Sequence, residues 1–258
     1  MKILVCVKQV PDLESRFKAN GAGVWFDETD LAWRMNEYDE YAVEQAVRLR
    51  EQLGEGSELV VLSIGPDRVV EVMKKALAMG CDRGVHVQDS AAALKDPAQI
   101  AATIVAYARD QHFDVIFTGM QSQDRGSAQV GVLVAAGLDC ACATTLIGFS
   151  YDDGTITGKR ELEGGLKGIV KLTTPALVTC QLGLNIPRYP TLPNIMKAKK
   201  KEILAIPVET LLHDPALATT ISFHPPAKKG GGLVLEGEIG SLVDQLLGIL
   251  KEKTAVLR

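Results

Sequence analysis

The chain has 258 residues, of which 47% are hydrophobic and 23% are charged, so it can bury a full core. Its formal net charge of −4 argues against a general nucleic-acid-binding protein. No apolar run approaches the ~18 residues of a membrane-spanning helix, and the first residues predict a strand rather than a signal peptide. The five cysteines, irregularly spaced, predict no disulfide framework, so we expect a soluble protein of a reducing compartment that does not insert into membranes.

Apolar runs of strand length alternate with helical patterns through the first half of the chain. Continuous apolar runs, typical of strands covered on both faces, occupy residues 3–7, 59–64, 84–88 and 114–118. Residues 12–30 are polar and predict a small hairpin or loop. Helical spacing of apolar residues marks residues 40–53, 69–79 and 98–108. Four strands alternating with three helices predict an α/β fold with a doubly wound, mainly parallel, Rossmann-like sheet.

The pattern changes after residue 143. Shorter strands with Asp-Gly and Gly-Gly turns predict an antiparallel extension, at residues 146–150, 155–159, 168–172 and 176–180. Residues 225–232 are rich in Pro, Lys and Gly and predict a linker, and apolar positions within residues 242–250 predict an amphipathic helix. We therefore divide the chain into an α/β nucleotide-binding domain, 1–224, and a linker with a C-terminal arm, 225–258. The helix either folds back or packs on a partner, and the linker favours a partner.

Ligands of open α/β sheets bind beyond the carboxyl ends of the strands, which directs attention to three loops at residues 8–12, 63–66 and 119–130. The third loop contains Gly119 and Gly126 and leads into a predicted helix at 130–138. With Ser127 as a helix N-cap, the amides at the helix start would form a nest for a phosphate, and Arg125 could add a charged contact. The loop matches neither GxGxxG nor a P-loop, so it predicts a bound nucleotide phosphate rather than an ATPase. The alternative is a Gly-rich loop that merely turns.

The sequence offers no catalytic or metal-binding constellation. The four histidines, at positions 86, 112, 213 and 224, fall on separate elements, and no Ser or Cys has a nucleophile-elbow context. Cys140 and Cys142 are one residue apart, which is too close for the usual metal-ligand spacing. We therefore predict no catalytic residue and no metal site.

Residues 188–201 place two prolines and a leucine ahead of a run of lysines. Pro190 and Pro193 restrict the backbone, so we expect Leu192 on a short stiff loop and Asn194 as the cap of a following basic helix. An apolar anchor beside a positive field suits docking to an acidic protein surface. The alternative is a surface turn with a solvated basic helix.

Five stretches in order resemble the beta subunit of electron-transfer flavoprotein, at residues 35–39, 76–84, 119–122, 163–166 and 188–201. The resemblance implies a cytoplasmic, bacterial-type electron carrier rather than an enzyme, paired with an alpha subunit that holds most of the FAD. It implies that electrons pass from acyl-CoA-type dehydrogenases through the FAD to a membrane quinone oxidoreductase. It also implies a structural AMP that is not consumed. Leu13, where some members have a flavin-facing tyrosine, and Lys167 depart from the family's pattern.

Carried over by position, the AMP contacts come from four segments: Cys6, Asn36, Glu37, Tyr38, Asp39, Ile64, Gly119, Met120, Gln121, Ser122, Gln123, Asp124, Arg125, Gly126, Ser127, Ala128, Gln129 and Val130. The resemblance assigns dehydrogenase docking to Leu192 and its neighbours: Tyr189, Thr191, Pro193, Asn194, Ile195, Met196, Lys197, Lys199 and Lys200.

Two alternatives stay open beside this interpretation. Electron-bifurcating members hold a second FAD in the AMP site, and residues 129–131 are common to some of them. Residues 125–127 and the 188–201 loop resemble the non-bifurcating type, so we favour AMP. The rival from another class is a stand-alone α/β nucleotide-binding sensor, which would have no use for that loop or for the C-terminal arm.

Overall fold

The structure is a computed structural model that describes residues 1–211, 215–224 and 230–255. By its internal contacts the chain divides into two compact units, Met1–Phe223 and His224–Arg258. The first unit contains the sheet and the candidate site. The described part of the second contains one helix.

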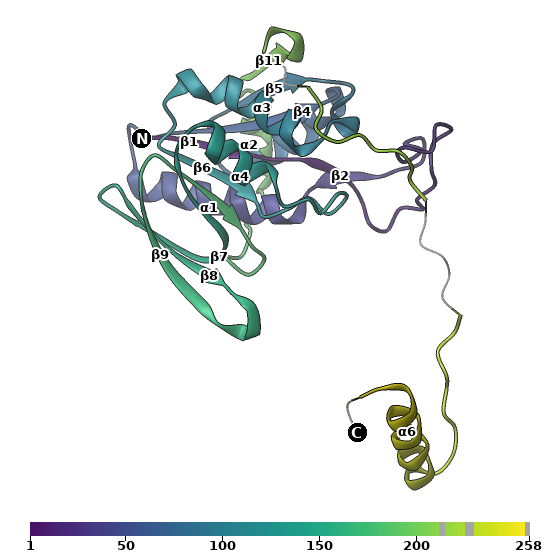
Figure 1. The fold of residues 1–258 in the computed structure, drawn as a ribbon. Coiled ribbons are helices and arrows are strands. Elements are labelled where there is room, and N and C mark those ends of the chain that lie inside the picture. The colour runs from purple at the N-terminus through teal and green to yellow at the C-terminus, as the bar shows by residue number, and fades with distance from the viewer. Residues whose placement is uncertain (212–214, 225–229, 256–258) are drawn as a thin grey trace. The chain divides into compact units, whose positions relative to one another are not determined.

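The first unit is built on a nine-stranded sheet in the order β11-β5-β4-β1-β6-β10-β7-β8-β9 (Figure 1). All neighbours from β11 to β7 run parallel, and β8 and β9 continue the sheet antiparallel. This confirms the predicted doubly wound, mainly parallel α/β fold. The strands are β1 Lys2–Cys6, β4 Glu58–Gly65, β5 Arg83–Gln88, β6 Val115–Gly119, β7 Ala141–Asp152, β8 Thr155–Glu161, β9 Lys167–Thr173, β10 Ala176–Cys180 and β11 Ile203–Pro207.

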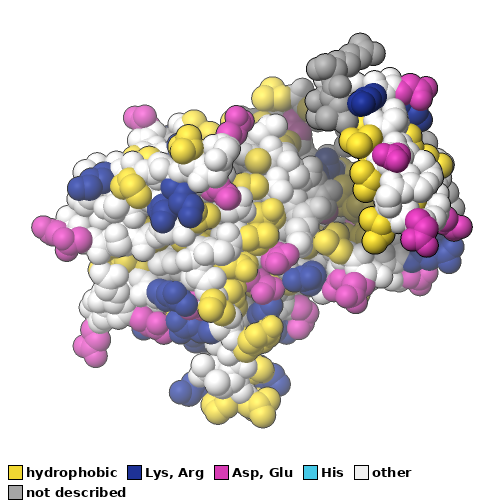
Figure 2. All heavy atoms as spheres, turned by 90° about the horizontal axis from the view of Figure 1, so that it is seen from below, with side chains coloured by type: hydrophobic (Ala, Val, Ile, Leu, Met, Phe, Trp, Pro, Cys, Tyr) yellow, Lys and Arg dark blue, Asp and Glu magenta, His cyan; other side chains and the backbone are white. Residues whose placement is uncertain are grey.

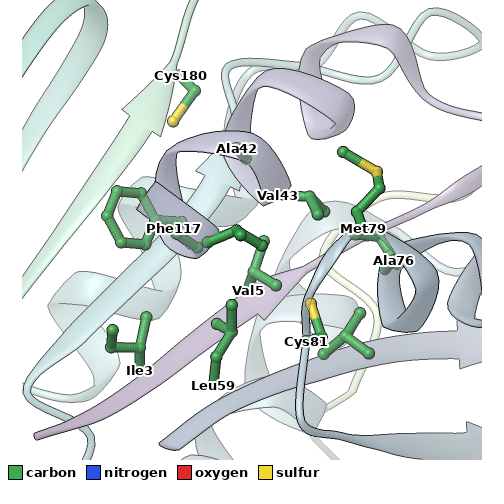
Figure 3. Packing of buried hydrophobic residues seen from close by; sticks show 14 of the residues in the cluster. Ile3, Val5, Ala42, Val43, Leu59, Ala76, Met79, Cys81, Phe117 and Cys180 are labelled. Atoms are coloured by element: carbon green, nitrogen blue, oxygen red, sulfur yellow. The ribbon is translucent and has the colours of Figure 1, made fainter. Parts of the chain in front are cut away.

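Helices cover both faces of the sheet, which explains why its central strands are apolar without alternation. Ile3 and Val5 of β1 pack into a core with α1 (Glu37–Leu53) and α2 (Val70–Met79), where Phe117 is the largest fully buried side chain (Figure 3). Leu4 points to the other face, into a core with α3 (Pro97–Ala108) and α4 (Val130–Gly137). Short 3₁₀ turns lie at Asp67–Val69, Ala92–Leu94, Arg109–Gln111, Glu163–Gly165 and Val208–Thr210.

Local sequence sets the helix ends. Asp96 caps α3 in a reciprocal capping box with Gln99, and Pro97 occupies the first helical turn, where its missing N–H costs nothing. Gly80 ends α2 with φ 145°, and a Cβ there would lie 2.7 Å from Val47 Cγ1. A glycine is therefore needed where α2 meets α1.

Strand β10 was expected in the antiparallel extension, and that prediction is wrong. It lies between β6 and β7 and runs parallel to both. All five of its residues are buried, as expected for a central strand covered on both faces rather than for a solvated hairpin. β7 is also longer than predicted, because its first half pairs with β10 and only the rest forms the hairpin with β8. The edge strand β11 was not predicted.

The segment between β1 and β4 differs from the prediction in two ways. The first helix begins at Glu37 rather than at residue 40, so residues 37–39 form its first turn instead of a loop. Two short strands, β2 (Gln9–Pro11) and β3 (Trp33–Met35), pair antiparallel and close the base of the polar 12–30 segment. Between β2 and β3, Trp25, Phe26 and Leu31 form a small separate cluster.

The second unit contains α6, Ile239–Lys253, which confirms the predicted C-terminal helix. None of its described residues is buried, and its apolar residues Ile239, Val243, Leu246 and Leu247 are between 39% and 79% exposed. Residues 225–229 of the predicted linker lie outside the described residues. No helix in the described parts of the chain is long and apolar enough to cross a membrane.

Candidate functional site

A pocket lies beyond the carboxyl ends of β1, β4 and β6, where ligands of doubly wound sheets bind. All three loops predicted from the sequence contribute to its wall, through Lys8 and Gln9, through Gly65 and Pro66, and through residues after Gly119. Of the predicted contacts, the wall includes Cys6, Asn36, Asp39, Ile64, Gly119, Met120, Gln121, Ser122, Asp124, Arg125, Ser127, Ala128, Gln129 and Val130.

One buried pair, Asn36 and Asp39, joins the loops around the pocket. The Asp39 carboxylate accepts hydrogen bonds from the backbone N–H of Lys8 at 2.7 Å and of Gly119 at 3.1 Å. It also accepts one from Asn36 Nδ2 at 3.0 Å. Asn36 in turn donates to the Gln121 carbonyl at 2.8 Å and accepts from the Gln123 N–H at 3.0 Å. The pair therefore fixes the loop after β1 and the loop after β6 to the start of α1.

Burial shifts the pKa of Asp39 and of Cys6 nearby. Burial raises the pKa of Asp39 to about 7, although its three hydrogen bonds and nearby Lys8 favour the ionised form. Burial, with the Asp39 charge as a smaller contribution, raises the pKa of the Cys6 thiol to about 12. Cys6 thus stays protonated at neutral pH, and its thiol is not an activated nucleophile.

Two glycines in this region are required by close packing. A Cβ on Gly119 would lie 2.2 Å from Asp39 Oδ1 and 2.8 Å from Tyr38 Cβ. A Cβ on Gly131 would lie 2.7 Å from Thr118 Oγ1. These two positions let α1 approach the end of β6 and let the start of α4 approach the sheet.

The loop between β6 and α4 brings the start of a helix to the pocket wall. Gly126 and Ala128 have φ near +60° and +53°, and the loop then enters α4 at Val130. The N-cap residue is Gln129, and its side chain makes no capping hydrogen bond, so the prediction that Ser127 caps the helix is wrong. Because no side chain caps the first turn of α4, its amides remain available to an acceptor in the pocket.

Charged side chains of the pocket are held by protein partners. Lys8 Nζ lies 2.7 Å from Asp124, whose side chain is 4% exposed, and 3.3 Å from Ser122 Oγ. The Arg125 guanidinium stacks over the Trp25 ring at 4.7 Å and donates to the Ala93 carbonyl. Arg125 therefore braces the wall in this structure, and its predicted contact with a phosphate stays a prediction.

Four predicted contacts, Glu37, Tyr38, Gln123 and Gly126, do not line the pocket. Gln123 Nε2 donates to Glu37 at 2.9 Å, and Gln121 Nε2 donates to the Tyr38 hydroxyl at 3.3 Å. These two hydrogen bonds hold the 119–130 loop against the first turn of α1, outside the pocket wall.

Part of the pocket wall was missed by sequence reasoning. Trp25, Trp33 and Arg68 line it, and the Arg68 guanidinium stacks over the Trp33 ring at 3.9 Å. Lys95 lines it as well and pairs with Asp89 at 2.6 Å. The only sequence signal for this part of the wall was a pair of tryptophans in a mainly polar segment. Local sequence does not show that this segment packs over the edge of the sheet.

The predicted docking residues lie just before, on and just after α5, Leu192–Ala198. Leu192 is its first residue rather than part of a loop. The N-cap is Thr191, whose hydroxyl accepts from the Asn194 N–H at 3.4 Å, so Asn194 does not cap the helix. Leu192 is 78% exposed and Tyr189 is 93% exposed, and exposure extends to the other predicted docking residues: Thr191, Pro193, Asn194, Ile195, Met196, Lys197, Lys199 and Lys200.

The last lysine of the basic run has a structural role. Lys201 Nζ donates to the carbonyls of Leu77 at 3.0 Å and Cys81 at 2.5 Å, at the end of α2. Ala198 is buried beside it. The run therefore offers exposed charges at Lys197, Lys199 and Lys200. Lys201 instead binds the chain after α5 to the carbonyls at the end of α2.

Two polar side chains outside the pocket, Arg160 and His86, contact groups elsewhere in the fold. Arg160 donates to the carbonyl and hydroxyl of Thr144, at 3.0 and 2.8 Å. His86 is buried against the Gly65 carbonyl at 2.8 Å, whereas His213 lies outside the described residues. Across the described residues, no group of three or more His, Cys, Asp and Glu side chains could hold a metal ion.

On the face drawn in Figure 2, Lys and Arg side chains are interspersed with Asp and Glu, and hydrophobic side chains lie between them. The coloured side chains of this face form no continuous basic surface of the kind that binds nucleic acid.

The sequence matches known proteins over its whole length. Residues 23–211 match the family model of the electron transfer flavoprotein domain. The chain is 35% identical to the electron transfer flavoprotein subunit beta of Bacillus subtilis, over 100% of both chains. It is 34% identical to that of Methylophilus methylotrophus, over 98% of both, and 36% identical to that of Homo sapiens, over 98% of this chain and 97% of the human one.

The chain belongs to the electron transfer flavoprotein beta-subunit family. The resemblance inferred from its five motif stretches is thereby confirmed. The subunits of this family are electron carriers. Of the stretches that carried the resemblance, 119–122 lies on the pocket wall and 188–201 includes α5.

We predict that Asp39→Asn lowers the free energy of unfolding by about 1–3 kcal/mol. The NH₂ group of an asparagine would face at least one of the two backbone N–H groups from which the carboxylate now accepts hydrogen bonds, and that N–H would lose its acceptor. Urea denaturation would measure the loss. Glu37→Gln is the matched control in the same helical turn, because a glutamine keeps an acceptor for Gln123. Equal stability of the two variants would contradict the joining role of Asp39.

Proposed function

We propose that this chain is the beta subunit of a heterodimeric electron transfer flavoprotein that binds structural AMP and docks acyl-CoA-type dehydrogenases through Leu192. The observation that carries the proposal is one chain with both a pocket at the uncapped start of α4 and an exposed apolar helix start. The relatives at 34–36% identity are named as beta subunits, which supports a partner alpha subunit for this chain as well.

The residues of the pocket fit an adenine mononucleotide. The uncapped first turn of α4 and the Gly-containing loop before it supply backbone donors for a phosphate. Cys6 and Ile64, at the ends of β1 and β4, supply a largely apolar wall for the nucleoside. With Cys6 protonated and both oxygens of the Asp39 carboxylate engaged by protein donors, the bound nucleotide would remain unhydrolysed.

The redox chemistry would belong to FAD, which takes up and releases electrons when bound. We infer that the alpha subunit holds most of this FAD. The beta subunit would then support the cofactor and bind the electron donor, and the electrons would leave for a membrane quinone oxidoreductase. We place this carrier in the cytoplasm.

The alternative of a second FAD in the pocket rests on residues 129–131. Arg125, Gly126 and Ser127 and the α5 segment favour AMP instead. A stand-alone nucleotide-binding sensor would leave the exposure of Leu192 and the apolar residues of α6 without a purpose.

The docking segment combines an apolar anchor with nearby positive charge. Leu192 and Met196 are 78% and 60% exposed, and with exposed Tyr189 and Ile195 they gather large apolar side chains within one short segment. Lys197, Lys199 and Lys200 would steer an acidic partner toward them, an effect that acts chiefly on the association rate.

The cofactor content of the heterodimer tests the proposal directly. We expect the purified, exhaustively desalted complex with its alpha subunit to release about one AMP and one FAD per heterodimer on heat denaturation, because the nest holds a single phosphate group and offers no catalyst. Chromatography of the supernatant against nucleotide standards would measure this. Two FAD with no AMP would assign the chain to the bifurcating type, and no nucleotide would remove the pocket assignment.

Leu192→Ala should weaken dehydrogenase binding about ten- to a hundredfold. Burying a leucine is worth about 1.5–3 kcal/mol, and each 1.4 kcal/mol is about tenfold in affinity. Titration of the heterodimer with a purified acyl-CoA dehydrogenase would measure the change. We expect the variant to keep the FAD content and melting temperature of the original protein. Leu217→Ala is the matched control, since Leu217 is 81% exposed but lies outside the docking segment. A drop of many degrees in melting temperature would show that Leu192 is part of the core.

The exposed apolar face of α6 supports a role in subunit assembly. We propose that it covers the alpha subunit. Truncation at Gly231 should loosen the heterodimer and reduce FAD retention while the sheet stays folded, as measured by analytical ultracentrifugation, flavin absorbance and circular dichroism. Leu247→Asp should weaken assembly in the full-length chain, whereas Gln245→Asp adds the same charge at a polar position of α6. Unchanged subunit affinity in both the truncation and Leu247→Asp would disprove the assignment.

A further inference from the structure

The chain just before α5 is fastened to α1 by one arginine. Arg188 Nε and Nη2 lie 2.8 and 3.2 Å from the two oxygens of Glu44. Its Nη1 and Nη2 lie 2.6 and 3.0 Å from the two oxygens of Glu51. The backbone N–H of Arg188 also donates to Glu44 at 3.1 Å. The planar guanidinium thus forks across two carboxylates that lie two helical turns apart.

Glu44 is the centre of this contact. Its side chain is 3% exposed, and it accepts a further bond from Arg48 at 2.6 Å. Burial alone would favour the neutral acid, but the hydrogen bonds from Arg188 and Arg48 outweigh it and hold the pKa of Glu44 below its ordinary value. A buried carboxylate that stays ionised fixes its partners in place, because an unpaired buried charge is costly.

The same helix holds the residues before Arg188. Asn185 Nδ2 donates to the Tyr41 carbonyl at 3.0 Å and lies 3.3 Å from Gln45 Oε1. Arg48 Nη2 lies 3.4 Å from the Ile186 carbonyl. The incoming chain is therefore bound to α1 along its length up to Arg188.

The apolar residues that follow have little packing of their own. Tyr189 and Leu192 are 93% and 78% exposed, and α5 has seven residues, which is too short to be stable without tertiary contacts. The segment is held at its far end by Lys201 on the α2 carbonyls. The position of Leu192 thus depends on Arg188 on one side and, on the other, on Lys201 and the packing of α5 on α2 through buried Ala198.

We propose that Arg188 is a positioning residue for partner docking, which holds Leu192 in its binding conformation before the dehydrogenase arrives. The inference rests on the proposed docking role of Leu192. Because the segment is already ordered in the free protein, binding does not incur the entropic cost of ordering it. The affinity is therefore higher and the association faster. Arg188 itself points to α1 and need not touch the partner.

The test uses the assembled heterodimer and an immobilised short-chain acyl-CoA dehydrogenase. Arg188→Lys keeps the charge but loses the fork across Glu44 and Glu51, and it should lower the affinity about fivefold or more, mainly through the association rate. Glu51→Gln, at a carboxylate with a 53% exposed side chain, is the milder variant if Arg188→Lys folds poorly. Amide hydrogen exchange in residues 189–198 of the free heterodimer should accelerate in both variants while FAD content is unchanged.

Glu40→Gln is the matched control, because it weakens an ion pair of α1 with Lys75 of α2, 2.7 Å long, that does not touch the docking segment. The combined Arg188→Lys and Leu192→Ala variant separates positioning from general stability. Without the leucine there is less to position, so the two effects should combine to less than the product of the single ones.

Unchanged affinity and exchange in Arg188→Lys, or losses that multiply in the double variant, would overturn the positioning role. The outcome also distinguishes the two proposals. If Leu192→Ala itself leaves dehydrogenase binding unaltered, the docking function fails. If Leu192→Ala weakens binding and Arg188→Lys and Glu51→Gln do not, only the positioning role of Arg188 fails.

Discussion

The hydrogen-bonded pair of Asn36 and Asp39 is the interaction on which the candidate site depends. Three loops leave the edge of the sheet independently, and nothing in the pairing of the strands fixes where they go next. The pair binds the loop after β1 and the loop after β6 to the first turn of α1. Gly119 makes this possible, because any side chain there would collide with Asp39. Buried polar contacts thus hold these two loops at a wall whose other side chains, such as Leu62 and Ile104, belong to the apolar core.

Helix α1 connects the candidate pocket with the proposed docking segment. Its first turn carries Asp39 at the pocket, and its later turns carry Glu44 and Glu51 beneath the docking segment. Asp39 and Glu44 are nearly excluded from solvent, so each demands full hydrogen bonding, and each obtains it from a segment distant in sequence. One rigid helix, packed on the sheet through Ala42, Val43 and Ala46, therefore sets the position of both regions.

The fold could be predicted to the extent that burial leaves a local trace. Strands covered on both faces appear as unbroken apolar runs, which is why β1, β4, β5 and β6 and their helices were found. β10 has the same trace but was placed in the extension, because pairing partners are chosen by tertiary packing and not by the strand itself. The motifs identified the family because short matching stretches of sequence can be recognised without knowing how they pack.

The sequence by itself determined the fold class, the C-terminal helix and the loops that meet at the sheet edge, because periodicity and chain order encode them. Only the tertiary structure decided which side chains of those loops face the pocket. It placed Trp25 and Arg68 on the wall and Gln123 behind it. It also turned Arg188 inward onto α1 and left Leu192 exposed four residues later. Such choices depend on which distant carboxylates and carbonyls need partners, and that need arises only when the chain is packed.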